Sequence, residues 1–197
     1  MKARHNPFRT GRILAVRYRP QGVSWDDLMA RLEALGRRGA IVGREGSGKT
    51  TLLEDLAERL EARGFSANLL TLTPAAPAFA PGFVTRLLEG AGPRDAILLD
   101  GADAMGALRW GRFRRMARAA GALIVTAHRP GLLPTLIECT TSPELLAGII
   151  REILGAESCR AEEAEAVQEL AIEMFARRAG NLREALRELY DRYGARA

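Results

Sequence analysis

The stretch Arg38–Thr50 reads Arg-Gly-Ala-Ile-Val-Gly-Arg-Glu-Gly-Ser-Gly-Lys-Thr, a short apolar run that leads directly into a glycine-rich loop. After the loop, leucines recur three and four residues apart as far as Arg63, which is typical of an amphipathic helix. The glycines Gly43, Gly46 and Gly48 let the backbone curl so that successive N–H groups converge on one point. A loop between a buried strand and a helix start therefore predicts a site for an anion, strengthened by the helix dipole.

Outward from this stretch, apolar runs alternate with helical patterns, and the last part of the chain is helical only. Alternation of this kind predicts a mainly parallel sheet with helices on both faces. Strands are expected at Arg38–Val42, Ala67–Leu72, Ala96–Asp100, Ala122–Ala127 and Thr135–Cys139. Helices are expected at Trp25–Leu35 (with Ser24 as N-cap), Lys49–Arg63, Gly82–Glu89, Leu108–Ala120, Pro143–Leu154, Ala161–Arg178 and Leu182–Tyr193.

The expected fold class is α/β, with three layers, a five-stranded sheet and a small C-terminal helical lid. Residues 1–36 are predicted to form a basic arm and a helix on the core, with a short strand at Arg12–Arg17. The core spans residues 37–142, and the lid spans residues 143–197. The lid is too small for an independent core, so we expect it to dock on the sheet.

Composition predicts a cytoplasmic protein with no membrane segment. Of the 197 residues 47% are apolar, yet no run approaches the roughly 18 apolar residues that span a bilayer. The basic start Met1–Phe8 leads into no apolar signal core, and the two cysteines have no metal or redox spacing. The net charge of +5 is carried almost wholly by arginine, since Lys2 and Lys49 are the only lysines. That skew resembles the codon choice of a GC-rich genome and is weak evidence for nucleic-acid binding.

The loop chemistry matches a nucleoside triphosphate with Mg²⁺, and ATP and ADP are the expected ligands. Lys49 would reach the β- and γ-phosphates and the Thr50 hydroxyl would ligate Mg²⁺. The alternative is a glycine turn that arose by chance. The nucleotide-binding residues expected here are Gly43, Arg44, Glu45, Gly46, Ser47, Gly48, Lys49, Thr50 and Thr51.

A second acidic element follows at Ile97-Leu98-Leu99-Asp100, an apolar run that ends in a carboxylate. Ligands of open α/β sheets bind at the carboxyl ends of the strands, so Asp100 is expected beside the loop. There it would orient Mg²⁺ together with Thr50. The alternative is an aspartate that caps the next turn.

Together these two motifs resemble the P-loop NTPase superfamily over roughly residues 38–142. The later run Leu123–Thr126 is similar to the extra strand of the additional-strand division, which lies between the two motif strands and ends in a polar sensor. The resemblance implies that Thr126, His128 or Arg129 contacts the γ-phosphate or the attacking water. The alternative for Thr126 is an ordinary β-branched strand residue.

The segment Arg177–Leu186 resembles the lid helix of AAA+ ATPases, in which a Gly-x-x-Arg element places an arginine over the phosphates. The resemblance implies that Gly180 ends one helix, Asn181 caps the next and Arg183 points at the nucleotide. A plain helix joint with a surface arginine is the alternative.

The chain departs from AAA+ enzymes directly after Asp100, where those enzymes have a glutamate and this chain has Gly101. Asp100-Gly101-Ala102-Asp103 resembles instead the acidic motif of the STAND NTPases. Asp103 is then the candidate base, and the expected catalytic set is Lys49, Asp100, Asp103 and Thr126. Loss of a positioned base costs about 10²–10⁴-fold in rate, so slow hydrolysis is expected. An arginine finger from a neighbouring copy (Arg112, Arg115 or Arg129) would require a homo-oligomer.

Arg109–Arg118 holds five arginines and two aromatic residues, a composition that can bind nucleic acid. Helical spacing favours the other interpretation, in which Phe113 and Met116 face the sheet and the arginines are solvated. Asn6-Pro7-Phe8 resembles the start of some DNA-handling AAA+ proteins. The sequence thus predicts a slow Mg-dependent ATPase that acts as a switch. The alternatives are a non-hydrolysing module that binds a partner protein or DNA, and a DNA-associated motor subunit; a small-molecule kinase fits less well.

Overall fold

The computed structural model describes residues 22–73, 75–76, 78–80, 82–154 and 161–195. The expected strand Arg12–Arg17 and the motif Asn6-Pro7-Phe8 lie outside the described residues. The chain divides into two compact units. The sheet unit contains the described residues of Arg19–Gly43 and Lys49–Cys139, and the helical unit contains Arg44–Gly48 with those of Thr140–Ala197.

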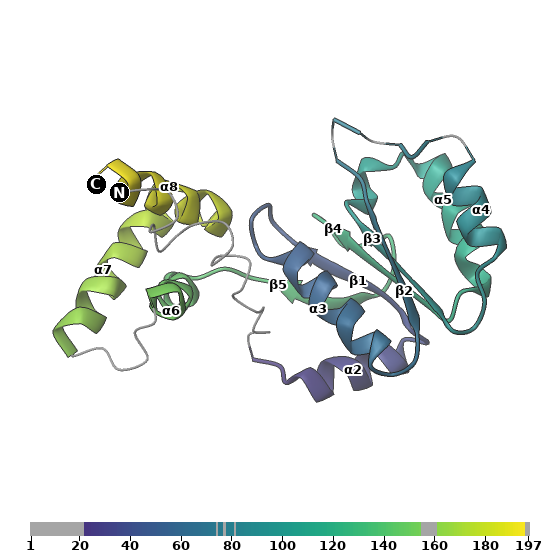
Figure 1. Cartoon of the computed structure of the whole chain (residues 1–197), viewed down its shortest axis with the longest axis horizontal. Coiled ribbons are helices and arrows are strands. Elements are labelled where there is room, and N and C mark those ends of the chain that lie inside the picture. The colour runs from purple at the N-terminus through teal and green to yellow at the C-terminus, as the bar shows by residue number, and fades with distance from the viewer. Residues whose placement is uncertain (1–21, 74, 77, 81, 155–160, 196–197) are drawn as a thin grey trace. The chain divides into compact units, whose positions relative to one another are not determined.

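The sheet unit has an α/β fold around a parallel five-stranded sheet, as the sequence predicted (Figure 1). All pairings between its strands are parallel, in the order β2-β3-β4-β1-β5. Strand β4 is buried along its whole length and β3 at all but its two end residues, because helices cover both faces of a parallel sheet. The strands are β1 (Arg38–Gly43), β2 (Ser66–Thr71), β3 (Asp95–Asp100), β4 (Ala122–Ala127) and β5 (Thr135–Cys139).

Helices α2 and α3 lie on one side of the sheet, and α4 and α5 lie on the other (Figure 1). The predicted cap of α2 is present, since the Asp27 N–H donates to the Ser24 hydroxyl over 3.1 Å. The helices are α2 (Trp25–Ala34), α3 (Lys49–Glu61), α4 (Phe83–Glu89) and α5 (Ala107–Met116), with short 3-10 turns η2 (Ala102–Ala104) and η3 (Ala117–Ala119).

Helix α5 is shorter than the expected Leu108–Ala120, because its last turn tightens into η3. The chain must then turn sharply at Gly121, whose N–H donates to the Gly92 carbonyl over 3.0 Å. A Cβ at Gly121 would lie 1.9 Å from the Pro93 carbonyl oxygen. This close approach requires glycine at the point where the chain enters β4.

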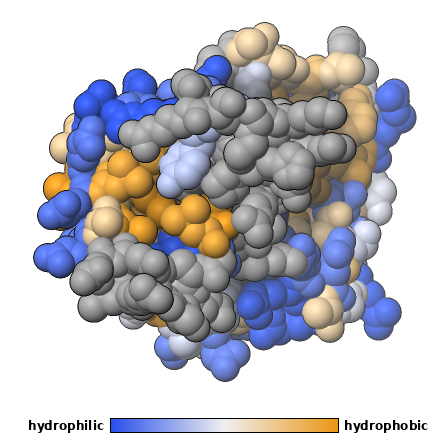
Figure 2. All heavy atoms as spheres, turned by 60° about the vertical axis from the view of Figure 1, so that its left-hand side comes forward, coloured by the Kyte–Doolittle hydropathy of each residue, from blue (hydrophilic) through white to orange (hydrophobic). Residues whose placement is uncertain are grey.

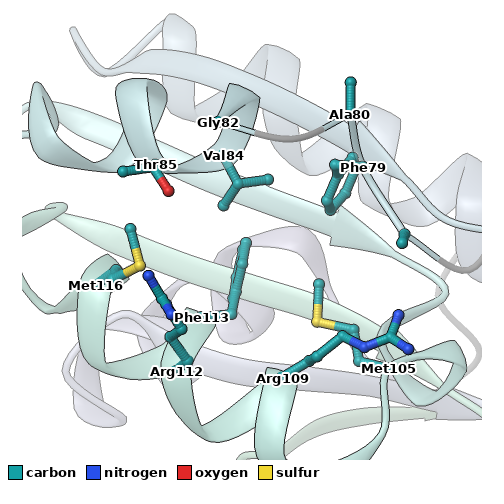
Figure 3. Close-up of a pocket in the computed structure, with 11 residues that line it drawn as sticks. Phe79, Ala80, Gly82, Val84, Thr85, Met105, Arg109, Arg112, Phe113 and Met116 are labelled. Atoms are coloured by element: carbon teal, nitrogen blue, oxygen red, sulfur yellow. The ribbon is translucent and has the colours of Figure 1, made fainter.

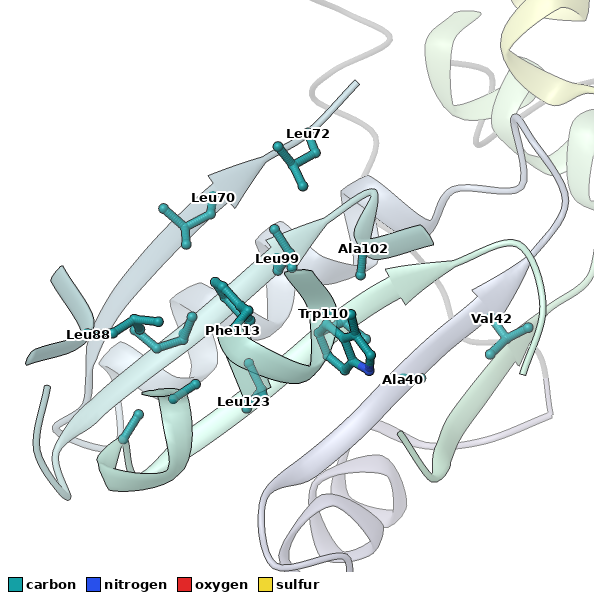
Figure 4. Close-up of a cluster of buried hydrophobic side chains, with 14 residues drawn as sticks. Ala40, Val42, Leu70, Leu72, Leu88, Leu99, Ala102, Trp110, Phe113 and Leu123 are labelled. Carbon is teal, nitrogen blue, oxygen red and sulfur yellow. The ribbon is translucent and has the colours of Figure 1, made fainter. Parts of the chain in front are cut away.

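The face of the sheet under α4 and α5 carries a large apolar cluster (Figure 4). Trp110 and Phe113 of α5 are only 8% and 3% exposed, and they pack over Leu99 and Leu123. Truncating a buried leucine to alanine costs about 2–5 kcal/mol in such a core. This cluster fixes α5 against the sheet and so fixes which of its side chains face solvent.

The helical unit consists of α6 (Pro143–Leu154), α7 (Ala161–Arg177) and α8 (Leu182–Ala195), which share one apolar cluster. The expectation that this segment is too small for a core of its own is therefore wrong, because the three helices bury apolar side chains against one another. The joint between α7 and α8 passes through Ala179 and Gly180, both at positive φ. Three arginines surround the Glu188 carboxylate there, and Arg178 donates to it over 2.6 Å. Burial by itself raises the pKa of Glu188, but the hydrogen bond from Arg178 and the neighbouring positive charges bring it below its ordinary value.

No helix in the described part of the chain has the length and apolar character needed to cross a membrane. Figure 2 shows a face with many hydrophilic residues around a smaller group of hydrophobic ones.

Candidate functional site

The glycine-rich loop begins at Gly43, the last residue of β1, and ends at Lys49, the first residue of α3. Gly46 and Gly48 have φ values of 73° and 88°, a region that residues with a Cβ rarely adopt. Within the helical unit, a Cβ at Gly46 would also lie 1.9 Å from Asn181 Oδ1. The loop therefore needs glycine for its conformation and for the close approach of Asn181.

Ser47 is the buried member of this loop, and its hydroxyl has no hydrogen-bond partner among the described residues. Buried hydroxyl groups without a partner are rare because their desolvation is uncompensated. Arg44 and Glu45 are exposed, whereas Thr51 is half-buried on α3.

The Lys49 ammonium donates to the Gly43 carbonyl over 2.8 Å. The side chain is thus directed back along the loop to the carboxyl end of β1. A compact ammonium can exchange this carbonyl for another oxygen without a large movement of its stem.

Asp100 is the centre of a hydrogen-bonded group at the carboxyl edge of the sheet. The Thr50 hydroxyl donates to Asp100 Oδ2 over 2.9 Å, and the Thr126 hydroxyl donates to Asp100 Oδ1 over 2.5 Å. The Gly101 N–H in turn donates to the Thr126 oxygen over 2.8 Å. The first turn of α3 and the ends of β3 and β4 are therefore joined through a single carboxylate, and β4 lies between β1 and β3.

Gly101 adopts a left-handed conformation with φ 78°. A Cβ there would lie 2.4 Å from the Leu72 carbonyl oxygen, because the Leu72 N–H is hydrogen-bonded to the Asp100 carbonyl. A glutamate cannot occupy this position unless the backbone moves. The position without a glutamate, Gly101, is thus part of a turn that leads the chain from β3 into η2.

That turn brings Asp103 to the tip of β4, where its carboxylate accepts hydrogen bonds from both the backbone and the ring Nδ1 of His128. The backbone bond measures 3.1 Å. Partial burial by itself raises the pKa of Asp103, but the hydrogen bonds and charge of His128 lower it below its ordinary value. The sequence named both residues and did not predict that they form a pair.

Glu54 was not named from the sequence, yet it lies close enough to Asp100 to interact with its charge. Burial first, and then the charges of Asp100, Asp55 and Glu58, raise the pKa of Glu54. It follows Thr50 by four residues on α3, so both lie on the same face of the helix. That four-residue spacing is visible in the sequence and could have placed Glu54 on the same side of the helix as Thr50.

Two arginines expected at the site are exposed: Arg129 in the sheet unit after β4, and Arg183 in the helical unit in the first turn of α8. Asn181 caps α8 as predicted, since its Oδ1 accepts from the Glu184 N–H over 3.1 Å. No family model and no curated protein matches this sequence. The residues of the site are therefore the basis for any functional proposal.

Helix α5 exposes several arginines, but its aromatic rings are not accessible to a nucleic acid. Trp110 and Phe113 are buried against the sheet with their rings stacked at 6.0 Å, so neither can stack on a base. The exposed arginines are Arg109, Arg112, Arg114, Arg115 and Arg118. This is the arrangement in which the arginines form a solvated face.

Proposed function

We propose that this protein binds Mg·ATP as a P-loop NTPase of the additional-strand division and works as a slow ATPase switch. One observation carries the proposal, namely the bonding of Thr50 and Thr126 to the two oxygens of Asp100. A hydroxyl from a helix start, held by a carboxylate at a strand end, is the donor set of a magnesium–phosphate site.

The residues of the loop fit a triphosphate. The Lys49 ammonium supplies a positive charge whose present acceptor is a backbone carbonyl. The buried Ser47 hydroxyl lacks a partner among the described residues, and a phosphate oxygen would satisfy it. Thr50 and Asp100 would hold Mg²⁺, which supplies charge neutralisation on the phosphates. Lys49 would exchange the Gly43 carbonyl for a phosphate oxygen, and Asp100 would keep the Thr50 hydroxyl oriented.

Slow hydrolysis follows from Gly101 and Asp103, which come shortly after Asp100 in the chain. Gly101 leaves no side chain to polarise water, and the Asp103 carboxylate is bonded to His128. An enzyme without a positioned base loses about 10²–10⁴-fold in rate. We infer that bound ATP persists long enough for a partner molecule to recognise the ATP-bound state. The helical unit would act as a lid, with Arg183 contacting the phosphates.

The Lys49→Ala variant tests ATP binding, and Lys2→Ala is its matched control because it removes the other lysine of the chain. Calorimetric titration with Mg·ATP should show at least a hundredfold loss of affinity for Lys49→Ala, since a charged phosphate contact is removed. Lys2→Ala should bind like the wild type. If Lys49→Ala kept full affinity, the assignment of the loop would be wrong.

The pairing of Asp103 with His128 also favours a second function, a module that binds ATP without hydrolysing it. Single-turnover assays with radiolabelled ATP, with and without DNA, separate the two. Measurable turnover that is lost in Asp100→Asn supports the ATPase. Tight binding with no turnover over hours supports the module.

A further inference from the structure

The sheet unit contains a cavity of about 300 Å³ between α5 on one side and residues 78–80 and 82–85 on the other (Figure 3). Phe79 and Val84 line one side, and Met105, Phe113 and Met116 line the other. Apart from two arginines, Thr85 supplies the one polar side chain of the lining. A mostly apolar cavity of this size accepts an apolar side chain, and its methionines can adapt to the shape of that side chain.

The surroundings of this cavity are apolar and positively charged. Leu108, in the first turn of α5, is 89% exposed. Phe83 is 44% exposed, with its ring centroid 6.2 Å from that of Phe79. Arg112 lines the cavity, and neither it nor Arg115 forms an ion pair with a described residue. No acidic residue occurs between Asp103 and Ala120 to offset these charges.

A nucleobase would be a poor occupant. Its several donors and acceptors would enter a cavity that offers them little besides Thr85 and the arginines, and buried polar groups without partners are costly. An aliphatic side chain flanked by carboxylates fits both the lining and its charge.

The helical unit presents such a group on the outer face of α7. Ile172 is 51% exposed, although Ala171 and Met174 beside it are buried in the cluster of that unit. Glu165 and Glu169 precede it by seven and three residues, so all three lie on one exposed face of the helix. An exposed isoleucine beside two glutamates complements an apolar cavity beside the positive charges of Arg112 and Arg115.

We propose that copies of this chain associate head to tail, with Ile172 of one copy in the α5 cavity of the next. Glu165 and Glu169 then lie against the arginines of α5. The two surfaces are different, so an assembly of any length keeps one free surface of each kind, one at each end, and can grow. The contact involves neither the glycine-rich loop nor Asp100, and it does not depend on ATP binding.

Sedimentation velocity of the full chain tests this association. The wild type should grow in mass with concentration up to about 100 µM, which covers micromolar dissociation constants. Raising the salt from 0.05 to 0.5 M should weaken the association, because exposed charges are screened. A wild type that stays monomeric throughout this range contradicts the proposal.

Two variants disable the two surfaces separately. Ile172→Glu removes the anchor, and Arg112→Glu places like charges at the cavity, so each should weaken association at least tenfold. Arg63→Glu and Leu69→Glu are the matched controls, since both residues are exposed and neither lies on these surfaces. Circular dichroism melts of all four confirm folding.

Mixing the two disabled variants gives the decisive result. The Arg112→Glu copy still has its Ile172 face, and the Ile172→Glu copy still has its cavity, so one native contact forms. The mixture should give a one-to-one dimer that grows no further. If the mixture stays monomeric, or if either variant alone associates like the wild type, the proposal is wrong. The proposal would also be wrong if the protein stayed monomeric and bound single-stranded DNA through Arg112.

Discussion

At the scale of the residue, Gly101 decides what kind of site follows Asp100. Its left-handed backbone and the nearby Leu72 carbonyl exclude any side chain at this position. The same turn directs Asp103 to His128 and leaves the Thr126 hydroxyl bonded to Asp100. Asp100 thus keeps its bonds to Thr50 and Thr126, while the Asp103 carboxylate is bonded to a histidine.

We predict that Gly101→Ala destabilises the protein by about 1–3 kcal/mol, the usual cost of a strained backbone position. Gly111→Ala on α5 is the matched control, because a Cβ there meets no atom within 4 Å. That change should be neutral or stabilise by up to about 1 kcal/mol, since alanine favours helix. The urea midpoints of unfolding of the two variants and the wild type measure these changes. A Gly101→Ala midpoint equal to that of the wild type would contradict the strain at Gly101.

At the scale of the element, the Asp103–His128 pair ties η2 to the end of β4. Asp100 ends β3 just before η2, and Thr126 of β4 donates to its carboxylate. The hydrogen bonds lower the pKa of Asp103 below 3.8, its ordinary value. The pair therefore contributes stability above that pH, and the contribution is lost as the pH falls through the pKa of the folded state.

Comparison of the wild type with Asp103→Asn measures this contribution. The difference in unfolding free energy should shrink as the pH falls below the ordinary carboxylate pKa. The effect should be small because the pair is partly exposed. Asp26→Asn, on an exposed helix start, serves as the control. A difference that grows as the pH falls from about 4 to 2 would contradict the lowered pKa of Asp103.

At the scale of the whole molecule, a ligand that binds only the folded state raises its stability. Mg·ATP at a hundred times its dissociation constant should raise the unfolding free energy by about 2.7 kcal/mol. Chelation of Mg²⁺ with EDTA should remove most of this gain, and Asp100→Asn should lose the dependence on Mg²⁺. Differential scanning calorimetry with each addition checks both, and a gain that survives EDTA would show that no metal takes part.

Much of the sheet unit could be predicted from the sequence. Its five strands follow from apolar runs long enough to cross a buried sheet, and Ser24 marks a helix start by local chemistry. The proximity of Thr50 to Asp100 was predicted because a strand end and a helix start fix where such side chains lie. Helix α5 ends before the expected Ala120 because its last turn tightens into η3, which the spacing of apolar residues does not show.

The sequence by itself determined the parallel α/β core, the loop with its lysine and threonine, and the carboxylate at the end of β3. These features depend on local periodicity and spacing, which survive without knowledge of distant contacts. Only the tertiary structure decided that Gly101 excludes a side chain, that Asp103 pairs with His128, and that a cavity opens between α5 and the segment before α4. Each of these depends on atoms far apart in the chain that the packed core brings within a few ångströms.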